Sequence, residues 1–165
     1  MKSLLIIRHG KSNRDDVSLS DFERPLADRG LTDAPTMGKR LAKRGVKPDL
    51  IVSSPATRAL ATARLIAREL NYPEKLIRHE PKLYAANVED WIETLQNLPD
   101  DRSCIALVGH NPAIEELLEI LAPRWAADVP TCAIAELQAD IPSWKDLTPA
   151  ALRPIHYDFP KNKAD

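Results

Sequence analysis

The chain has 165 residues, a length that predicts one domain over residues 1–165 with a sizeable buried core. An apolar fraction of 44% and a charged fraction of 28% are those of an ordinary soluble globular protein, and no run approaches the ~20 apolar residues of a membrane span. Lys and Arg number 23 against 24 Asp and Glu, so a net charge of -1 excludes a broad basic field for nucleic acid.

Apolar runs, each broken by glycine, proline or polar residues, divide the chain into strands and helices. The first run, residues 4–7, predicts a buried strand that breaks at once into Arg8-His9-Gly10. Residues 13–23 are polar and acidic, which predicts a loop over the carboxyl end of that strand. In chain order, strands are predicted at 4–7, 50–53, 76–79, 104–108, 131–137 and 155–159, and helices at 33–44, 55–70, 88–98 and 112–121. Prolines flank the last strand and favour a sheet edge, and the tail from about residue 161 is predicted to be disordered.

Three of these helices begin with residues typical of helix caps. Thr32, placed after Gly30, is predicted to cap the first helix, and Ser54 the second. Asn111 is predicted to cap the fourth helix, with Pro112 as its first residue.

The two cysteines indicate a reducing compartment. Cys104 and Cys132 both lie in apolar, strand-like runs, so we predict buried free thiols and no disulfide. The apolar run near the N-terminus is too short for the core of a signal peptide. We therefore expect a cytoplasmic protein.

Strands that alternate with helices predict an α/β fold, in which a mostly parallel sheet carries helices on both faces. The strand-to-helix junctions of such a sheet lie on one edge, where ligands bind. Three junctions bring polar side chains to that edge: Arg8-His9-Gly10, Ser53-Ser54-Pro55 with Arg58 beyond it, and Gly109-His110-Asn111.

Arginines and histidines beside helix N-termini suit a small, multiply charged oxyanion, and phosphate fits best. Arg58 falls in the first turn of its helix, where a cation opposes the helix macrodipole. It is therefore either an indifferent surface residue or one whose charge is needed there. A neutral histidine beside phosphorus is a competent nucleophile, and neighbouring positive charge would keep it neutral.

Two other interpretations of the histidines stay open at this point. Either His9 or His110, taken alone, is more often a structural hydrogen-bonding residue than a catalyst. Both could instead bind zinc, although no cysteine or carboxylate stands at a matching spacing and two arginines would repel the cation. His79 and His156 have no partner that the sequence identifies.

The chain resembles the histidine phosphatase superfamily, which includes cofactor-dependent phosphoglycerate mutases and acid phosphatases. Arg8-His9-Gly10, Arg58 and His110 match the family's signature, and the resemblance spans roughly residues 2–121. The resemblance is close to the short bacterial phosphohistidine phosphatases of the SixA type. Further matching motifs are Arg24-Pro25-Leu26 followed by Gly30, Ser53-Ser54-Pro55, Leu83-Tyr84 and Val108-Gly109-His110-Asn111-Pro112.

The resemblance implies a three-layer α-β-α sandwich with a phosphoglycerate mutase-like, mostly parallel sheet and an antiparallel edge. It implies that His9 is the nucleophile, that Arg8, Arg58 and His110 hold the phosphoryl group, and that no metal or organic cofactor takes part. We place Ser12 beside them as a substrate-binding residue.

The chain departs from the mutases and acid phosphatases at the general acid. Their acid follows the third strand, near Leu83-Tyr84-Ala85, and alanine cannot donate a proton. The remaining candidates are Glu80, Glu89 and Asp21, or no residue at all. The chain also has no room for the lid helices of the mutases, so an open pocket is expected.

We therefore expect a phosphatase that acts through a phosphohistidine on His9, with phosphohistidine on a protein partner, such as a histidine phosphotransfer domain, as substrate. The alternatives are a small-molecule or aryl phosphomonoesterase, or a phosphate-binding module without turnover. Neither nucleic acid nor membrane is expected as a partner.

Overall fold

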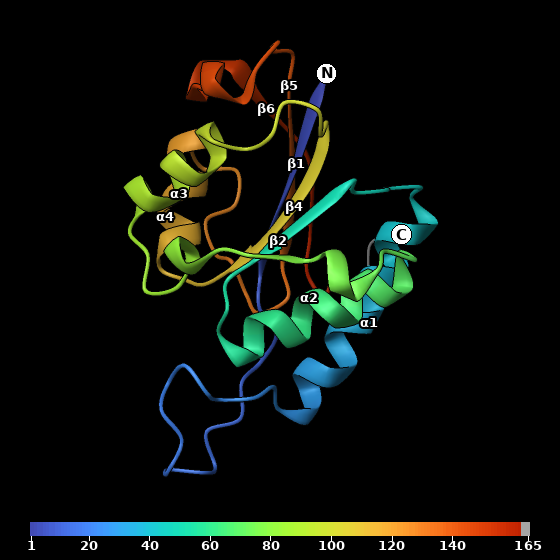
Figure 1. Ribbon diagram of the computed structural model, residues 1–165, viewed down its shortest axis with the longest axis vertical. Helices are drawn as coiled ribbons and strands as arrows, with labels where there is room; N and C mark the ends of the chain where they lie inside the picture. The colour runs from blue at the N-terminus through green and yellow to red at the C-terminus, as the bar shows by residue number, and fades with distance from the viewer. Residues whose placement is uncertain (163–165) are drawn as a thin grey trace.

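The first strand lies in the middle of the sheet around which the chain folds. The structure, a computed structural model, describes residues 1–162 (Figure 1). β1 (Lys2–Arg8) runs parallel to β4 (Cys104–Gly109) and antiparallel to β5 (Ile134–Ala139). The sheet order is β3-β2-β4-β1-β5-β6, with β2 at Leu50–Ser53, β3 at Arg78–His79 and β6 at Leu152–Asp158. The mostly parallel sheet with an antiparallel edge is confirmed.

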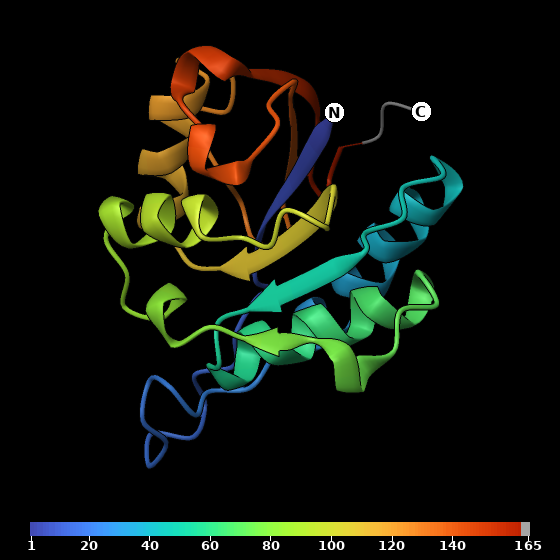
Figure 2. The same ribbon diagram turned by 45° about the horizontal axis from the view of Figure 1, so that its top comes forward.

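Helices cover both faces of this sheet, as Figures 1 and 2 show. Within the described residues, α1 (Asp28–Lys43) and α2 (Thr57–Glu69) pack on one face, and α3 (Val88–Gln96) and α4 (Ala113–Leu121) pack on the other. Leu5 and Ile7 are buried with the first pair of helices, whereas Leu4 and Ile6 are buried with the second. Successive side chains of a strand point to opposite faces, so this apolar run anchors both layers.

Short turns and connections complete the described chain. Cys132 is buried, Cys104 is partly buried, and both are free thiols as predicted. Burial raises the pKa of Cys104 to about 11 and that of Cys132 to about 12, so both thiols stay protonated.

No helix in residues 1–162 has the length and apolar character needed to cross a bilayer. Single 3₁₀ turns lie at Glu74–Leu76, Pro81–Leu83, Trp144–Asp146 and Pro149–Ala151.

The predicted start of the first helix is wrong. α1 begins at Asp28, so Gly30 lies inside its first turn, and Thr32 is an internal residue that hydrogen-bonds the Asp28 carbonyl over 3.1 Å. A Cβ atom on Gly30 would lie 2.6 Å from the Lys11 carbonyl oxygen. Glycine is needed at position 30 because the helix packs closely on the loop that follows β1, and not because the chain breaks there before the helix begins.

The cap predictions for the second and fourth helices are wrong as well. α2 begins at Thr57 and α4 at Ala113, and in each helix the N-cap position holds a residue without a side-chain cap. Ser54 and Asn111 direct their side chains elsewhere: the Ser54 hydroxyl bonds His110, and the Asn111 amide donates to Glu115 and to the Val129 carbonyl. The side chains of Ser54 and Asn111 could cap a helix, but in the fold they bond to residues distant in the chain.

Three predicted strands are shorter or shifted. The last, β6, begins at Leu152, three residues before its predicted start, so Pro154 lies inside the strand and does not flank it. The third strand contains only Arg78–His79, because the preceding residues form a 3₁₀ turn. The fifth begins at Ile134 and extends to Ala139, because Cys132 takes a positive φ of 63° and interrupts the extended backbone. The tail predicted from about residue 161 to be disordered falls, beyond residue 162, outside the described residues.

Candidate active site

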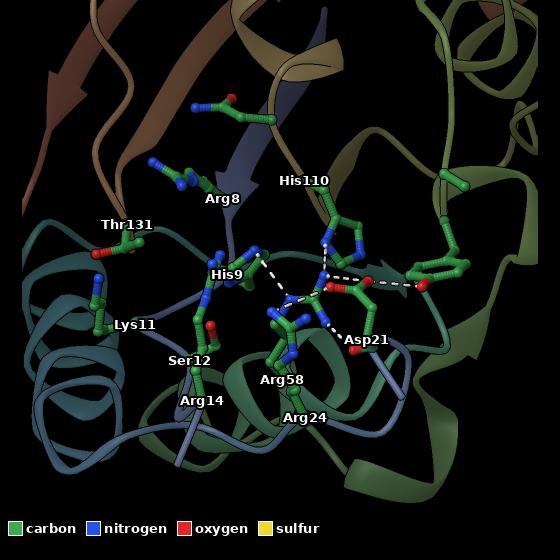
Figure 3. A pocket seen from close by; sticks show the side chains of 13 residues that line it. Arg8, His9, Lys11, Ser12, Arg14, Asp21, Arg24, Arg58, His110 and Thr131 are labelled. Atoms are coloured by element: carbon green, nitrogen blue, oxygen red, sulfur yellow. Dashed lines mark hydrogen bonds and ion pairs between the residues drawn. The ribbon is translucent and has the colours of Figure 1, made fainter. Parts of the chain in front are cut away.

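The ends of β1 and β4 and the first turn of α2 surround one cavity of about 330 Å³ (Figure 3). All three predicted junctions therefore meet at the carboxyl edge of the sheet, since β1, β2 and β4 are parallel. The cavity is lined by Arg8, His9, Lys11, Ser12, Arg14, Asp21, Arg24, Arg58, Tyr84, Ala85, His110, Asn111 and Thr131.

His9 follows β1 directly and is only 7% exposed. Its Nδ1 atom lies 2.7 Å from the carbonyl oxygen of Gly10, and its Nε2 atom lies 3.4 Å from Nε of Arg58. A carbonyl oxygen and a guanidinium fix opposite roles on the two ring nitrogens, because the first only accepts and the second only donates. Nδ1 therefore carries the proton, and Nε2 presents its lone pair toward the guanidinium.

Arg58 joins the parts of the site. Besides its contact with His9, its Nη2 atom lies 3.4 Å from Nδ1 of His110. On its other side, Nη1 donates to the backbone oxygen of Asp21 over 2.6 Å, and Nη2 donates to the Asp21 carboxylate over 3.1 Å. Arg58 is buried despite its charge. Its place in the first turn of α2 puts a cation between the two histidines, which excludes the interpretation of an indifferent surface residue.

His110 follows β4 and lies beside His9, with 4.9 Å between the ring centroids. Its Nε2 atom lies 2.8 Å from the hydroxyl of Ser54, which also accepts a hydrogen bond from the backbone of Ala56. Because the Arg58 guanidinium donates to Nδ1, the proton of a neutral His110 is on Nε2 and is held by Ser54. Ser54 thus sets the orientation of the second histidine.

Burial among cations keeps both histidines neutral at pH 7. Desolvation, followed by the charges of Arg58 and Arg8, lowers the pKa of His9 to about 4, although the bond to Gly10 opposes this. Desolvation, His9 and Arg58 lower the pKa of His110 to about 3. A neutral imidazole has a lone pair available for attack on phosphorus.

Arg8 and Asn111 occupy the side of the cavity formed by the segment before β5. Nη1 of Arg8 donates to the carbonyl oxygen of Val129 over 2.8 Å, and Asn111 donates to the same oxygen over 3.0 Å. Burial lowers the pKa of Arg8, but its guanidinium remains a cation at neutral pH. The Nε atom of Arg8 has no hydrogen-bond partner within the described residues.

Among the three candidate acids, only Asp21 lines the cavity. The hydroxyl of Tyr84 donates to the Asp21 carboxylate over 2.7 Å. This bond, together with the bond from Arg58, holds the pKa of Asp21 below its ordinary value, so Asp21 is ionised at neutral pH. Glu80 accepts a hydrogen bond from the backbone of Lys82 and, like Glu89, does not line the cavity.

Thr62, on α2, ties together the two segments that carry His9 and Arg58. Its hydroxyl accepts from the backbone nitrogen of Gly10 over 2.9 Å and donates to the carbonyl of Arg58 over 2.8 Å. Sequence reasoning missed this residue. The signal available in the sequence was a threonine on the apolar face of the predicted second helix. The structure shows that this threonine is fully buried.

The walls of the cavity are strongly cationic. Arg8 and Arg58 were predicted there, whereas Lys11, Arg14 and Arg24 were not. Asp21 is the one carboxylate among the lining residues. Ser12 also lines the cavity, and its role in substrate binding stays a prediction. Its backbone forms a bridge with Leu26 that closes the loop after β1.

The remaining histidines lie elsewhere, and the zinc alternative has no ligand cluster to support it. His79 on β3 is exposed, His156 on β6 is partly buried, and neither lines the cavity. Among residues 1–162, no group of three or more His, Cys, Asp and Glu side chains is placed to hold a metal ion.

The chain is similar to proteins of known sequence and structure over most of its length. An uncharacterized chloroplastic protein of Arabidopsis thaliana is 33% identical over 88% of this chain and 70% of its own. An uncharacterized protein of Mycobacterium tuberculosis is 29% identical over 94% of this chain and 100% of its own.

Solved structures show the same fold. A candidate phosphohistidine phosphatase SixA from Agrobacterium tumefaciens superposes with a TM-score of 0.82 at 25% identity, covering 96% of this chain and 98% of that one. A protein histidine phosphatase SixA complexed with tungstate gives 0.79 at 24% identity, covering 96% and 97%. Residues 4–91 match the Histidine phosphatase superfamily (branch 1). Arg8, His9 and Arg58 all lie within this matched segment, and the chain belongs to that superfamily.

Proposed function

We propose that the protein is a phosphohistidine phosphatase, which takes the phosphoryl group of a protein-bound phosphohistidine onto His9 and then transfers it to water. The observation that carries the proposal is the state of His9. Its proton is held on Nδ1 by Gly10, its pKa is about 4, and its Nε2 atom faces the cationic side of the cavity. These are the requirements of an imidazole nucleophile for phosphorus.

In the first step, Nε2 of His9 bonds to phosphorus as the bond to the leaving group breaks. The proton stays on Nδ1 and keeps its hydrogen bond to the Gly10 carbonyl oxygen, which stabilises the positive charge that develops on the phosphorylated ring. Arg8 and Arg58 carry the charge to hold the equatorial oxygens, and His110 lies beside them. In the second step, water attacks phosphorus, inorganic phosphate leaves, and neutral His9 is restored.

The leaving group is limited because, among the described residues, no protonated carboxyl lines the cavity. Asp21 is held ionised by Tyr84 and Arg58, and Ala85 has no proton to give. A phosphohistidine whose ring carries a proton on its other nitrogen releases neutral imidazole, whose conjugate acid has a pKa of about 6.5. A phenol has a pKa of about 10 and an alkyl alcohol a much higher one, so the demand for an acid rises in that order. The similarity to a candidate phosphohistidine phosphatase over nearly the whole chain supports the first of these substrates.

An aryl phosphate is the alternative that a specific contact favours. Tyr84 lines the cavity and packs edge-on against Phe22, with 4.9 Å between the ring centroids. An aromatic leaving group in the cavity would pack against the Tyr84 ring, which Phe22 supports from behind.

The test compares kcat/KM on a phosphohistidine protein, an aryl phosphate and a sugar phosphate. We expect activity to fall in that order, with the sugar phosphate nearly inert, and His9→Ala to abolish all three reactions. Efficient hydrolysis of the sugar phosphate would reveal an acid that the structure does not identify and would overturn the phosphohistidine assignment. A wild-type protein that binds phosphate without turnover would be a binding module, and loss of activity on chelation with rescue by zinc would favour a metal enzyme.

A further inference from the structure

The proposed mechanism assigns no role to two cations of the cavity wall, Lys11 and Arg14. Arg8 and Arg58 flank His9, and Arg24 pairs with Asp21 over 3.5 Å. The side chains of Lys11 and Arg14 also line the cavity, but within residues 1–162 neither forms an ion pair or a hydrogen bond. The whole chain has a net charge of -1, so this local excess of positive charge is not a general property of its surface.

The backbone holds these two cations beside the site. The Lys11 carbonyl accepts from the backbone of Ala27 over 2.8 Å, and the backbone of Asn13 donates to Pro25 over 2.8 Å. The base of the loop after β1 is therefore closed on both sides of Ser12. Figure 3 shows Lys11 next to Thr131, on the side of His9 opposite Asp21.

The surface continues beyond Thr131 into a second cavity of about 280 Å³. Thr131 lines both cavities, and its hydroxyl accepts a hydrogen bond from Arg29 over 3.1 Å. Phe159 and two prolines give the second cavity an apolar wall. A single phosphorylated residue fills one cavity only, whereas a polypeptide that carries it can extend over both.

We infer that the substrate is a polypeptide with acidic residues beside its phosphorylated residue, and that Lys11 and Arg14 bind these acidic side chains. The inference rests on the proposed phosphatase function and adds the class of sequence that the site selects. Positive charge at the mouth favours an acidic segment by attraction in the complex and by steering its approach. The phosphoryl group itself is held by other residues, so the preference acts on the flanks of the substrate.

The test uses two phosphopeptides of equal length, with glutamates or with glutamines around the central phosphorylated residue. Each is made with phosphohistidine and with phosphotyrosine, so that the charge preference is measured apart from the leaving group. Exposed ion pairs are weak individually, so we expect kcat/KM for the glutamate peptide to be about five- to tenfold higher at low ionic strength. The preference should largely disappear at about 0.5 M salt.

The variant Lys11→Glu/Arg14→Glu should lose this preference or reverse it. The matched control is Lys47→Glu/Lys75→Glu, which changes two exposed lysines located before β2 and before β3, at the opposite edge of the sheet. The control has the same net charge as the test variant and should keep the wild-type ratio. An equal loss in both variants would make the preference a matter of overall charge and would overturn the inference.

Failure of the inference and failure of the proposed function have different signatures. Hydrolysis of both peptides at equal rates would overturn the inference and leave the phosphatase in place. If no peptide is hydrolysed, the proposed function fails, but the affinities of the two phosphopeptides for His9→Ala still measure the charge preference. Equal affinities for the glutamate and glutamine peptides overturn the inference. A single-stranded oligonucleotide that competes for the site more strongly than the glutamate peptide overturns it as well.

Discussion

Arg58 on α2 binds Asp21, on the loop after β1, through two contacts: 2.6 Å to the backbone oxygen and 3.1 Å to the carboxylate. The same guanidinium reaches His9 and His110. The loop therefore holds the cation of the site in place, but the carboxylate also brings a negative charge to a cavity suited to an oxyanion. A phosphoryl group entering this cavity meets attraction from Arg58 and repulsion from Asp21.

Asp21→Asn separates these two effects, because the amide oxygen can still accept from Arg58 and Tyr84. We expect inorganic phosphate or tungstate to inhibit the variant at concentrations about three- to tenfold lower, since one repulsive charge is removed. Asp15→Asn, on the same loop and outside the cavity, is the control. Weaker inhibition in Asp21→Asn would mean that the carboxylate acts chiefly to orient Arg58.

The covalent intermediate should form on His9. Quenching during turnover at neutral or alkaline pH should trap phosphate in a linkage that acid hydrolyses and base does not, and mass spectrometry of the peptides should place it on His9. The structure gives the reason, since Nε2 of His9 is the free ring nitrogen that faces Arg58. A label on Ser12, or no label in a protein that turns over, would refute the assignment of the nucleophile.

Arg58→Ala should lower kcat by about two to three orders of magnitude and weaken phosphate binding, as loss of one transition-state donor does in other enzymes. Steady-state kinetics and phosphate inhibition measure the two effects. Arg64→Ala changes an exposed arginine of the same helix and should leave both quantities near wild type. A similar loss in both variants would point to a defect in α2 and not to a role in the site.

Stability should fall as the pH drops from about 6.5 to about 4. The folded pKa values of His9 and His110, about 4 and about 3, lie below the ordinary value of 6.5, so in this window the unfolded chain binds more protons than the folded one. The loss for each buried histidine is on the order of 2 kcal/mol near pH 4.5, measured by urea unfolding.

His9→Asn and His110→Asn should each flatten this pH dependence. His79→Asn changes an exposed histidine and should leave the curve unaltered. An unchanged slope in both site variants would show that carboxylates alone cause the acid destabilisation.

Thr62→Val tests whether Thr62 positions the site. Valine keeps the shape but leaves the buried Gly10 N–H without its acceptor, which should destabilise the fold by about 1–3 kcal/mol and allow the His9 segment to move. We expect kcat to fall about tenfold with little change in KM, because no substrate contact is lost. Thr62→Ser keeps the hydroxyl and should restore kcat to within about twofold. Full activity in Thr62→Val would show that the hydrogen bond is dispensable.

Local patterns explain what could be predicted. The strand ending at Arg8 and the strand ending at Gly109 are uninterrupted apolar runs with abrupt polar ends, so their existence and their shared edge follow from local sequence and the geometry of parallel sheets. The fold class expected on this basis is confirmed. The superfamily, expected from the resemblance of Arg8-His9-Gly10, Arg58 and His110 to its signature, is confirmed by the match over residues 4–91. Helix starts were less predictable, because Ser54 and Asn111 have the chemistry of caps but bind tertiary partners.

The sequence by itself determined the sheet, the helices that cover it and the arrival of Arg8, His9, Arg58 and His110 at one edge. Only the tertiary structure decided that Asp21 meets Arg58 and Tyr84, that Thr62 binds Gly10, and that desolvation is the main cause of the lowered pKa of both histidines. The physical reason is that hydrophobic periodicity follows from contacts between an element and the core. The path of a polar loop and the desolvation of a ring depend instead on groups distant in the chain, whose positions are set once the layers have packed.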